Sequence, residues 1–134
     1  MHDGPPTDAM ACPCGLPAAY RACCGRIHRG EAPAVTAEAL MRSRYSAFAV
    51  GDAGYLARSW HPDTRPTRLD HDGATVWRRL QIVDTDAGGP EDDEGVVEFR
   101  ATYVRDGQHG VLHERSRFDR FGGRWVYTDG EFPG

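Results

Sequence analysis

Apolar and polar residues alternate along Gly95-Val96-Val97-Glu98-Phe99-Arg100-Ala101-Thr102-Tyr103-Val104. This period of two predicts a β-strand, because successive side chains of a strand point to opposite faces of a sheet. The residues of one face, which we expect to be buried, are all apolar or aromatic: Val97, Phe99, Ala101 and Tyr103. Asp106-Gly107 follows directly and is typical of a tight hairpin turn, so the strand belongs to an antiparallel sheet.

Three further strands complete the predicted sheet. They are expected over Thr75–Val83, His109–Phe121 and Arg124–Thr128. The first is rich in β-branched residues, and Gly122-Gly123 provides a second tight turn between the last two. Six acidic residues lie between Asp84 and Gly95. This charge predicts a solvent-exposed hairpin loop.

Two helices are predicted ahead of the sheet. Thr36 is a suitable N-cap for the first, which runs to Val50 and ends at Gly51. Asp52 caps the second, which we expect over residues 53–61 because Pro62 ends it at His61. Apolar residues mark the core face of the first helix: Ala37, Leu40, Met41, Tyr45 and Phe48. Helices followed by antiparallel strands predict an α+β fold, with the helices packed on one face of a curved sheet.

All four cysteines of the chain lie within thirteen residues: Cys12, Cys14, Cys23 and Cys24. Four thiolates brought together by tight turns can complete a tetrahedral zinc site, with no position open for catalysis. We therefore predict a structural Zn²⁺ ion held by a knuckle over residues 11–30. A disulfide or redox pair is the alternative, but a C-x-x-C pair is absent, and neighbours such as Cys23 and Cys24 bridge each other only with strain.

The segment ahead of the knuckle indicates a cytoplasmic location. Residues 1–10 are expected to be disordered, and they contain no apolar core of a signal peptide. Clustered cysteines inside the cell bind metal more often than they form structural disulfides. No apolar stretch of the chain approaches the length of a membrane span, so we expect no membrane insertion.

Charge separates the knuckle from the remainder of the chain. The net charge is −4, and residues 31–134 hold 18 acidic residues against 13 arginines. General nucleic-acid binding by the main domain is therefore not expected. Residues 9–30 contain Arg21, Arg26 and Arg29 and no acidic residue. These arginines would offset the negative charge of four thiolates around one zinc ion.

Glu114 is the first candidate for a functional side chain. The period of two places it on one strand face with Leu112, Ser116 and Phe118, and His113 on the opposite face. If that face lines the inside of the fold, Glu114 is a candidate general base or ligand anchor. The interpretation we prefer is a structural ion pair with Arg42 or Arg44.

Six more residues are candidates to line a ligand pocket with Glu114: Arg44, Tyr45, Trp60, His61, Trp125 and Tyr127. Arg44 could bind an anion, and aromatic side chains often form the walls of ligand cavities. Each also has a structural interpretation. The aromatic residues would fill the core, Arg44 would make a packing salt bridge, and His61 would cap a helix end.

The spacing of the cysteines resembles the SEC-C zinc motif, C-x-C-x8-C-(C/H), named for its place at the C-terminus of the SecA translocation ATPase. All four zinc-binding positions of that motif match the cysteines, and Gly15, Tyr20 and Gly25 fit it as well. The usual Ser-Gly-Lys-Lys stretch is replaced here by Leu16-Pro17-Ala18-Ala19. This replacement removes the lysines that would contact partners.

The remainder of the chain resembles the YchJ family of small bacterial proteins. The matching blocks span nearly the whole chain in order: Leu40-Met41-Arg42-Ser43-Arg44-Tyr45-Ser46-Ala47-Phe48, Tyr55-Leu56, Ser59-Trp60-His61-Pro62, His113-Glu114-Arg115-Ser116-Arg117-Phe118, Gly123-Arg124-Trp125-Val126-Tyr127 and Asp129-Gly130. The resemblance implies a nuclear-transport-factor-2-like domain over residues 34–134. Such a domain is a cone of helices on a strongly curved sheet, with a pocket inside.

Two functional hypotheses follow. The preferred one is a cytoplasmic, non-enzymatic adaptor that contacts a protein or ribosome partner through the zinc knuckle. The alternative is a small-molecule-binding protein or enzyme that uses the pocket inside the cone. A homodimer through the outer face of the sheet is also expected, by analogy with folds of this type.

Overall fold

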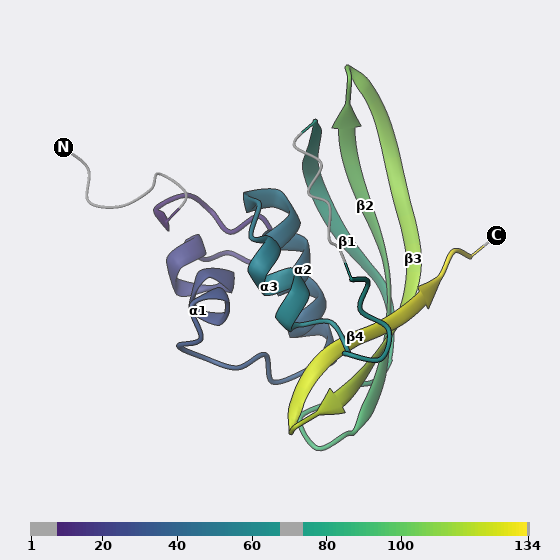
Figure 1. Cartoon of the computed structure of the whole chain (residues 1–134). Helices are drawn as coiled ribbons and strands as arrows, with labels where there is room; N and C mark the ends of the chain where they lie inside the picture. Colours follow the sequence, from purple (N-terminus) through teal and green to yellow (C-terminus); the bar gives the residue numbers. More distant parts are fainter. Residues whose placement is uncertain (1–7, 68–73, 134) are drawn as a thin grey trace.

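The computed structural model describes residues 8–67 and 74–133. The disorder predicted for residues 1–10 falls mostly outside these ranges. The helices and strands of these ranges are, in chain order, the 3-10 helix η2 (Tyr20–Ala22), helices α1 (Cys24–His28), α2 (Ala37–Val50) and α3 (Ala53–Arg58), and strands β1 (Thr75–Ala87), β2 (Glu94–Arg105), β3 (Gln108–Phe121) and β4 (Arg124–Glu131). The predicted α+β fold is confirmed, since the helices lie together on one side of a curved sheet (Figure 1).

The sheet is a simple antiparallel meander in the order β1-β2-β3-β4. Both predicted tight turns are present. The φ angles are 51° and 77° at Asp106 and Gly107, and 61° and 81° at Gly122 and Gly123. Two consecutive positive φ values are those of a type I′ turn, whose twist matches that of the flanking strands.

The first connection of the sheet is shorter than predicted. The ladder between β1 and β2 continues to the pair Ala87↔Gly95, so the first four residues of the predicted acidic loop belong to β1. Only residues 88–93 form the loop. Their conformation depends on Gly88, which has a φ of 82°, a value that L side chains rarely adopt.

Strand β1 contains two irregularities. Its register against β2 shifts between Trp77 and Arg79, and again between Ile82 and Asp84. Shifts of this kind are β-bulges, which bend a strand and increase its local twist. They contribute to the strong curvature of the sheet visible in Figure 1.

The caps predicted for α2 are confirmed. The Thr36 side chain accepts a hydrogen bond of 3.0 Å from the Ala39 amide, and Gly51 ends the helix with a φ of 80°. Phe48, expected on the core face, is instead 37% exposed and lies at the rim against Trp77, with 6.0 Å between the ring centroids.

Helix α3 ends at Arg58, three residues earlier than predicted. The cause is pairing with β4. The Tyr127 amide donates to the Ser59 carbonyl at 2.8 Å, and the His61 amide donates to the Tyr127 carbonyl at 2.7 Å. Because this short bridge to β4 holds Trp60 and His61 outside the helix, α3 ends before Pro62 is reached.

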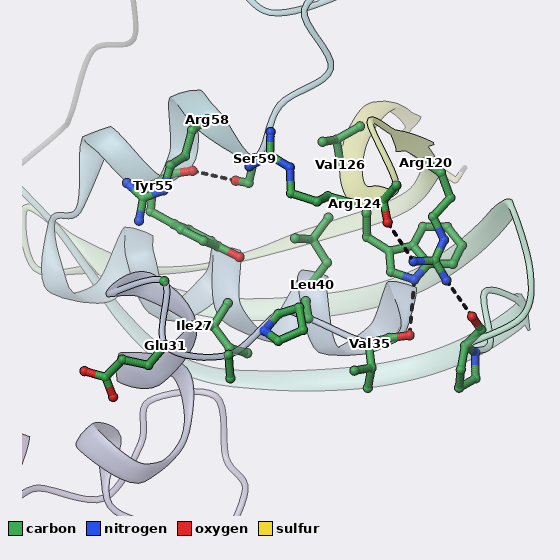
Figure 2. A pocket seen from close by; sticks show the side chains of 17 residues that line it. Ile27, Glu31, Val35, Leu40, Tyr55, Arg58, Ser59, Arg120, Arg124 and Val126 are labelled. Atoms are coloured by element: carbon green, nitrogen blue, oxygen red, sulfur yellow. Dashed lines mark hydrogen bonds between the residues drawn. The ribbon is translucent and has the colours of Figure 1, made fainter.

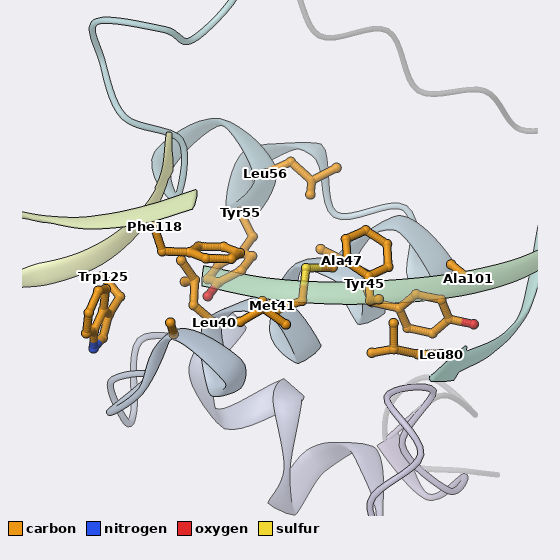
Figure 3. Close-up of a cluster of buried hydrophobic side chains, with 13 residues drawn as sticks. Leu40, Met41, Tyr45, Ala47, Tyr55, Leu56, Leu80, Ala101, Phe118 and Trp125 are labelled. Atoms are coloured by element: carbon orange, nitrogen blue, oxygen red, sulfur yellow. The ribbon is translucent and has the colours of Figure 1, made fainter. Parts of the chain in front are cut away.

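The core lies between α2, α3 and the concave face of the sheet (Figure 3). Leu40 and Met41 of α2 contribute to it, as do Phe99 of β2 and Phe118 of β3. Phe118 is only 1% exposed, and burial of such a side chain is worth roughly 1.5–3 kcal/mol. No helix in the described ranges is both long and apolar enough to cross a membrane.

Candidate metal centre and pockets

The knuckle is built from two turns that bring the cysteines together. The Gly15 amide donates to the Cys12 carbonyl at 3.2 Å, and the Cys12 amide donates to the Ala18 carbonyl at 2.9 Å. Gly15 has a φ of 94°, which explains the glycine at this position. Helices η2 and α1 then bring Cys23 and Cys24 to the same point.

The four Sγ atoms all lie within 4.8 Å of one another. The Sγ atoms of Cys14 and Cys23 are 3.7 Å apart, too far for a disulfide bond. A tetrahedral site with Zn–S bonds of about 2.3 Å places its sulfurs about 3.8 Å apart. The donor set and its spacing therefore fit a four-coordinate, thiolate-bound metal ion.

Burial makes this a closed site. Cys12, Cys14 and Cys24 are 4% exposed or less. Burial raises the pKa of the Cys23 thiol to about 12, while hydrogen bonds from Cys14 and Cys24 lower the pKa of Cys12. A metal ion that binds here would displace the thiol protons. Cys23 is partly exposed, but four cysteine ligands would fill every position of a tetrahedral ion and leave none for a substrate.

Helix α2 supports the cluster directly. The Ser46 hydroxyl lies 3.6 Å from the Cys12 sulfur, and the Arg42 guanidinium donates to the Cys14 carbonyl at 2.7 Å. Arg42 also donates to Glu38 at 3.0 Å. Hydrogen bonds of this kind around a metal site orient its ligands.

His28 joins the knuckle to the body of the molecule. It is 6% exposed, and its Nε2 lies 2.8 Å from the Ser43 carbonyl of α2. The ring of Tyr55 in α3 stacks on it, with centroids 4.6 Å apart. Burial lowers the pKa of His28, so the imidazole is neutral at pH 7. The knuckle is therefore docked against both α2 and α3.

Arg44 is buried inside the fold, with only 4% of its surface exposed. It donates to the Leu56 carbonyl at 2.9 Å and to the Ser59 hydroxyl at 2.7 Å. Its guanidinium carbon lies 5.1 Å from the ring centroid of Trp60 and 4.8 Å from that of Tyr127. Burial lowers the pKa of Arg44 to about 10, so the side chain keeps its charge and is stabilised by the two rings.

Glu114 lies near this group, but not in the predicted ion pair. One carboxylate oxygen accepts hydrogen bonds from Ser116 at 2.7 Å and from Tyr127 at 2.8 Å. Among the described residues no arginine lies within ion-pair distance of Glu114, so the preferred interpretation was wrong on this point. Burial raises the pKa of Tyr127, which keeps its phenol protonated and able to donate. His113 does face away, and contacts Glu98 at 2.6 Å.

The structure brings together four of the seven candidate pocket residues and separates the other three. Arg44, Trp60, Glu114 and Tyr127 form the connected group. Tyr45 packs against Trp77 with ring centroids 6.1 Å apart. His61 packs against Phe121 at 5.2 Å, and the Trp125 indole donates to the Val35 carbonyl at 3.3 Å.

A pocket of about 520 Å³ lies elsewhere, between α1, the linker over residues 30–35, α3 and the turn that joins β3 to β4 (Figure 2). Trp125 is the one candidate residue in its lining. Three arginines line it as well: Arg58, Arg120 and Arg124. The sequence carried one usable signal for them, since the Gly122-Gly123 turn brings Arg120 and Arg124 to the same end of the sheet. Nothing in the sequence indicated that the linker folds over this end.

The comparisons with known proteins agree with this arrangement of helices, sheet and knuckle. A family model described as the middle NTF2-like domain of YchJ matches residues 36–130. The chain belongs to the YchJ family. A UPF0225 protein of Streptomyces coelicolor is 58% identical over 121 residues, which cover 90% of this chain and 94% of the relative. A UPF0225 protein of Bordetella parapertussis is 48% identical over 133 residues, covering 95% and 96%.

Two solved structures share the fold of this YchJ chain. One is a SEC-C motif containing protein from Rhodopseudomonas palustris, with a TM-score of 0.81 and 34% identity over 93% of this chain and 100% of that one. The other is a SEC-C motif containing protein from Psychrobacter arcticus, with a TM-score of 0.76 and 26% identity over 92% and 82%. The resemblance of the knuckle to a SEC-C motif and of the body to the YchJ family is thus confirmed.

Proposed function

We propose that this YchJ protein is a cytoplasmic, non-enzymatic adaptor whose binding surface is a knuckle held together by one structural Zn²⁺ ion. The observation that carries the proposal is the closed cluster of four thiols beside exposed arginines. With no open coordination position, the ion would stabilise the knuckle and take no part in a reaction.

The zinc part is tested by metal analysis of protein purified under reducing conditions without added metal. We expect about one equivalent of zinc, since structural sites of this type bind tightly at neutral pH. The double variant Cys12→Ser/Cys14→Ser should retain almost none. Less than about half an equivalent in intact, reduced wild-type protein would contradict the proposal.

The adaptor part rests on the exposed side of the knuckle. The side chains of Arg21 and Arg26 are exposed and make no ion pair within the described ranges, whereas Arg29 is paired with Glu31 at 2.6 Å. Two apolar side chains on the same segment are also exposed, Met10 at 51% and Leu16 at 43%. Unpaired positive charge and exposed apolar side chains in and next to the knuckle suit an acidic protein surface as partner.

This role is tested with a variant that leaves the metal site intact. Arg21→Gln/Arg26→Gln should still bind zinc and fold, but should capture the partner from native cell extract at a strongly reduced level. Arg65→Gln/Arg100→Gln removes two exposed arginines outside the knuckle and serves as the matched control. Equal capture by both double variants would refute the proposed surface, and recovery of ribosomes in place of one protein would identify a ribosomal partner.

A homodimer through the outer face of the sheet remains a proposal. Sedimentation equilibrium would measure it directly, since a dimer doubles the mass. A single species at the monomer mass over a wide concentration range would rule out the dimer under those conditions.

A second candidate function is ligand binding inside the cone, and one observation favours it. Within the described part of the chain, the buried indole nitrogen of Trp60 has no hydrogen-bond partner; it lies beside the charged Arg44 and near Glu114. An unsatisfied buried donor is uncommon and can mark a site where a ligand or water binds. Addition of small anions or amides should shift the Trp60 indole resonance in an NMR titration, and Glu114→Gln should change that response. An unchanged indole resonance with every compound would count against a ligand here.

A further inference from the structure

The pocket between the knuckle and the end of the sheet has the size of a ligand site. Its volume is about 520 Å³, within the roughly 300–1,000 Å³ of small-molecule pockets. Its wall includes Ile27 of α1, Leu40 of α2 and Trp125 of β4, and these side chains give it an apolar floor. Figure 2 shows the arginine side chains around this floor.

Arg120 is held rigidly in the wall of the pocket. Its guanidinium donates to three carbonyl groups, those of Pro90, Asp92 and Gly123, at 2.8 to 3.2 Å. It also stacks on the Trp125 ring, with its central carbon 4.3 Å from the ring centroid. No carboxylate pairs with it among the described residues. The pocket therefore has a rigid cation in its wall.

Arg58 and Arg124 add two more positive groups. Arg58 donates to the His28 carbonyl and stacks on Tyr55 at 5.0 Å. Arg124 is exposed, and neither arginine makes an ion pair within the described part of the chain. In Figure 2 Arg124 reaches from the start of β4 across the pocket toward Ser59.

The single acidic residue of the lining does not offset these charges. Glu31 is paired with Arg29, which lies outside the lining, through two hydrogen bonds of 2.6 and 3.2 Å. The pocket thus combines an apolar floor with three arginines that make no ion pair among the described residues. Guanidinium groups bind carboxylate and phosphate oxygens strongly, because each bond is assisted by charge.

We propose that this pocket binds a small organic anion: an aromatic or branched aliphatic group that lies on the apolar floor and carries a phosphate or carboxylate held by Arg124 and Arg58. The site differs from the knuckle surface and from the interior group of Arg44. Because α1 and the linker form one of its walls, ligand binding would also hold the knuckle against the sheet.

The test uses the zinc-loaded full chain and three probes in NMR titrations: phenyl phosphate, inorganic phosphate and phenol. We expect phenyl phosphate to shift the Trp125 indole resonance and the amides of Ile27 and Gly123. Inorganic phosphate alone and phenol alone should bind at least tenfold more weakly, because each supplies only one part of the ligand.

Arg124→Gln is the decisive variant. Arg124 is exposed, so its replacement should leave the fold and the zinc content unchanged, while affinity for phenyl phosphate falls about tenfold or more, as expected when a charged hydrogen bond is lost. Arg100→Gln, an exposed arginine of β2, is the matched control and should bind as the wild type does. Equal affinity of all three proteins, binding of inorganic phosphate as tightly as phenyl phosphate, or no shift at the pocket at millimolar probe would each overturn the proposal.

Discussion

Gly130 of β4 leaves the space that the Glu114 carboxylate fills. A Cβ atom at this position would lie 2.1 Å from the Glu114 Oε2 atom, the one that accepts from Ser116 and Tyr127. The absence of a side chain at Gly130 thus leaves room for the hydrogen bonds that join Glu114 to Ser116 and Tyr127. No pattern within a single strand could predict this, because Gly130 and Glu114 meet only through the register of β3 and β4.

We predict that Gly130→Ala destabilises the protein by about 2 kcal/mol, since displacement of the carboxylate breaks two hydrogen bonds worth about 1 kcal/mol each. Urea denaturation monitored by tryptophan fluorescence measures the change. Gly54→Ala is the control: its Cβ would contact only side-chain atoms at 3.6 Å or more, and alanine favours the helix. A Gly130→Ala variant as stable as the control would disprove the predicted clash.

His28 predicts a specific dependence of stability on pH. Burial lowers its pKa in the folded state, although the carboxylate of Asp52, 3.9 Å from Nδ1, acts in the opposite direction and Arg58 acts with burial. Below pH 6.5, the ordinary pKa of histidine, His28 is therefore protonated more readily in the unfolded chain than in the folded protein. Stability must fall as pH drops below 6.5 toward the folded pKa.

The check is the free energy of unfolding at about pH 7.5 and about pH 5.5, for wild type and for His28→Gln. The wild type should lose more stability between the two values than the variant, whatever their difference at the higher pH. Both proteins keep the four cysteines, so acid effects on metal binding are common to both. Equal losses would show that His28 does not titrate in this way.

Helix α2 is buried on two sides, and the sequence revealed only one of them. The apolar positions predicted the side that faces the sheet. The other side includes Ser43 and Ser46, which are both 0% exposed and face the knuckle through the Ser43 carbonyl and the Ser46 hydroxyl. Serine carries no hydrophobic signal, so the knuckle's docking on this side could not be predicted from periodicity. The capping residues and tight turns were predictable because their chemistry is local.

Gly95 packs closely against Gly88 and against Ala37 of α2, so we predict that one methyl group added at Gly95 strongly destabilises the fold. A Cβ at Gly95 would lie 2.5 Å from the Gly88 Cα and 3.0 Å from the Ala37 Cβ. Backbone cannot rotate away as a carboxylate can, so we expect Gly95→Ala to cost about 3 kcal/mol or more, above the loss for Gly130→Ala. Urea denaturation gives the comparison.

Gly89→Ala, in the loop that precedes β2, is the matched control. Its Cβ would meet only the Asp92 carboxylate at 3.4 Å, an ordinary contact. This variant should stay within about 0.5 kcal/mol of the wild type. If Gly95→Ala were as mild as Gly89→Ala, the packing of the connection on α2 would be looser than the distances imply.

At the scale of the whole molecule, removal of a bound metal ion should destabilise the knuckle and α2 and leave the sheet intact. Cys12 and Cys14 meet α2 through Ser46 and Arg42, whereas no hydrogen bond among the described residues joins the central ladder of β2 and β3 to the cluster. In hydrogen exchange, chelation or Cys12→Ser/Cys14→Ser should raise exchange in the knuckle and in α2 first. Uniform loss of protection in all elements would instead mean that the metal holds the entire fold.

The order and type of the larger elements could be predicted, because each has a periodic pattern of its own. The way in which these elements pack against one another could not be predicted. The pocket lined by Arg58, Arg120 and Arg124 draws on five separate stretches of the chain, and no local pattern encodes their distance from one another. The cysteine cluster was the exception, since two short turns suffice to assemble it.

The bulges of β1 have a consequence for behaviour at high concentration. Strand β1 is an outer strand of the meander, and a flat outer strand can add a strand from a second molecule and start a growing aggregate. Two register shifts and the adjacent charges of Arg78 and Arg79 spoil the regular array of amide and carbonyl groups that such growth needs. At the opposite edge, the Trp60–Tyr127 bridge covers part of β4. Both edge strands of the sheet thus have features that hinder the addition of a strand from another molecule.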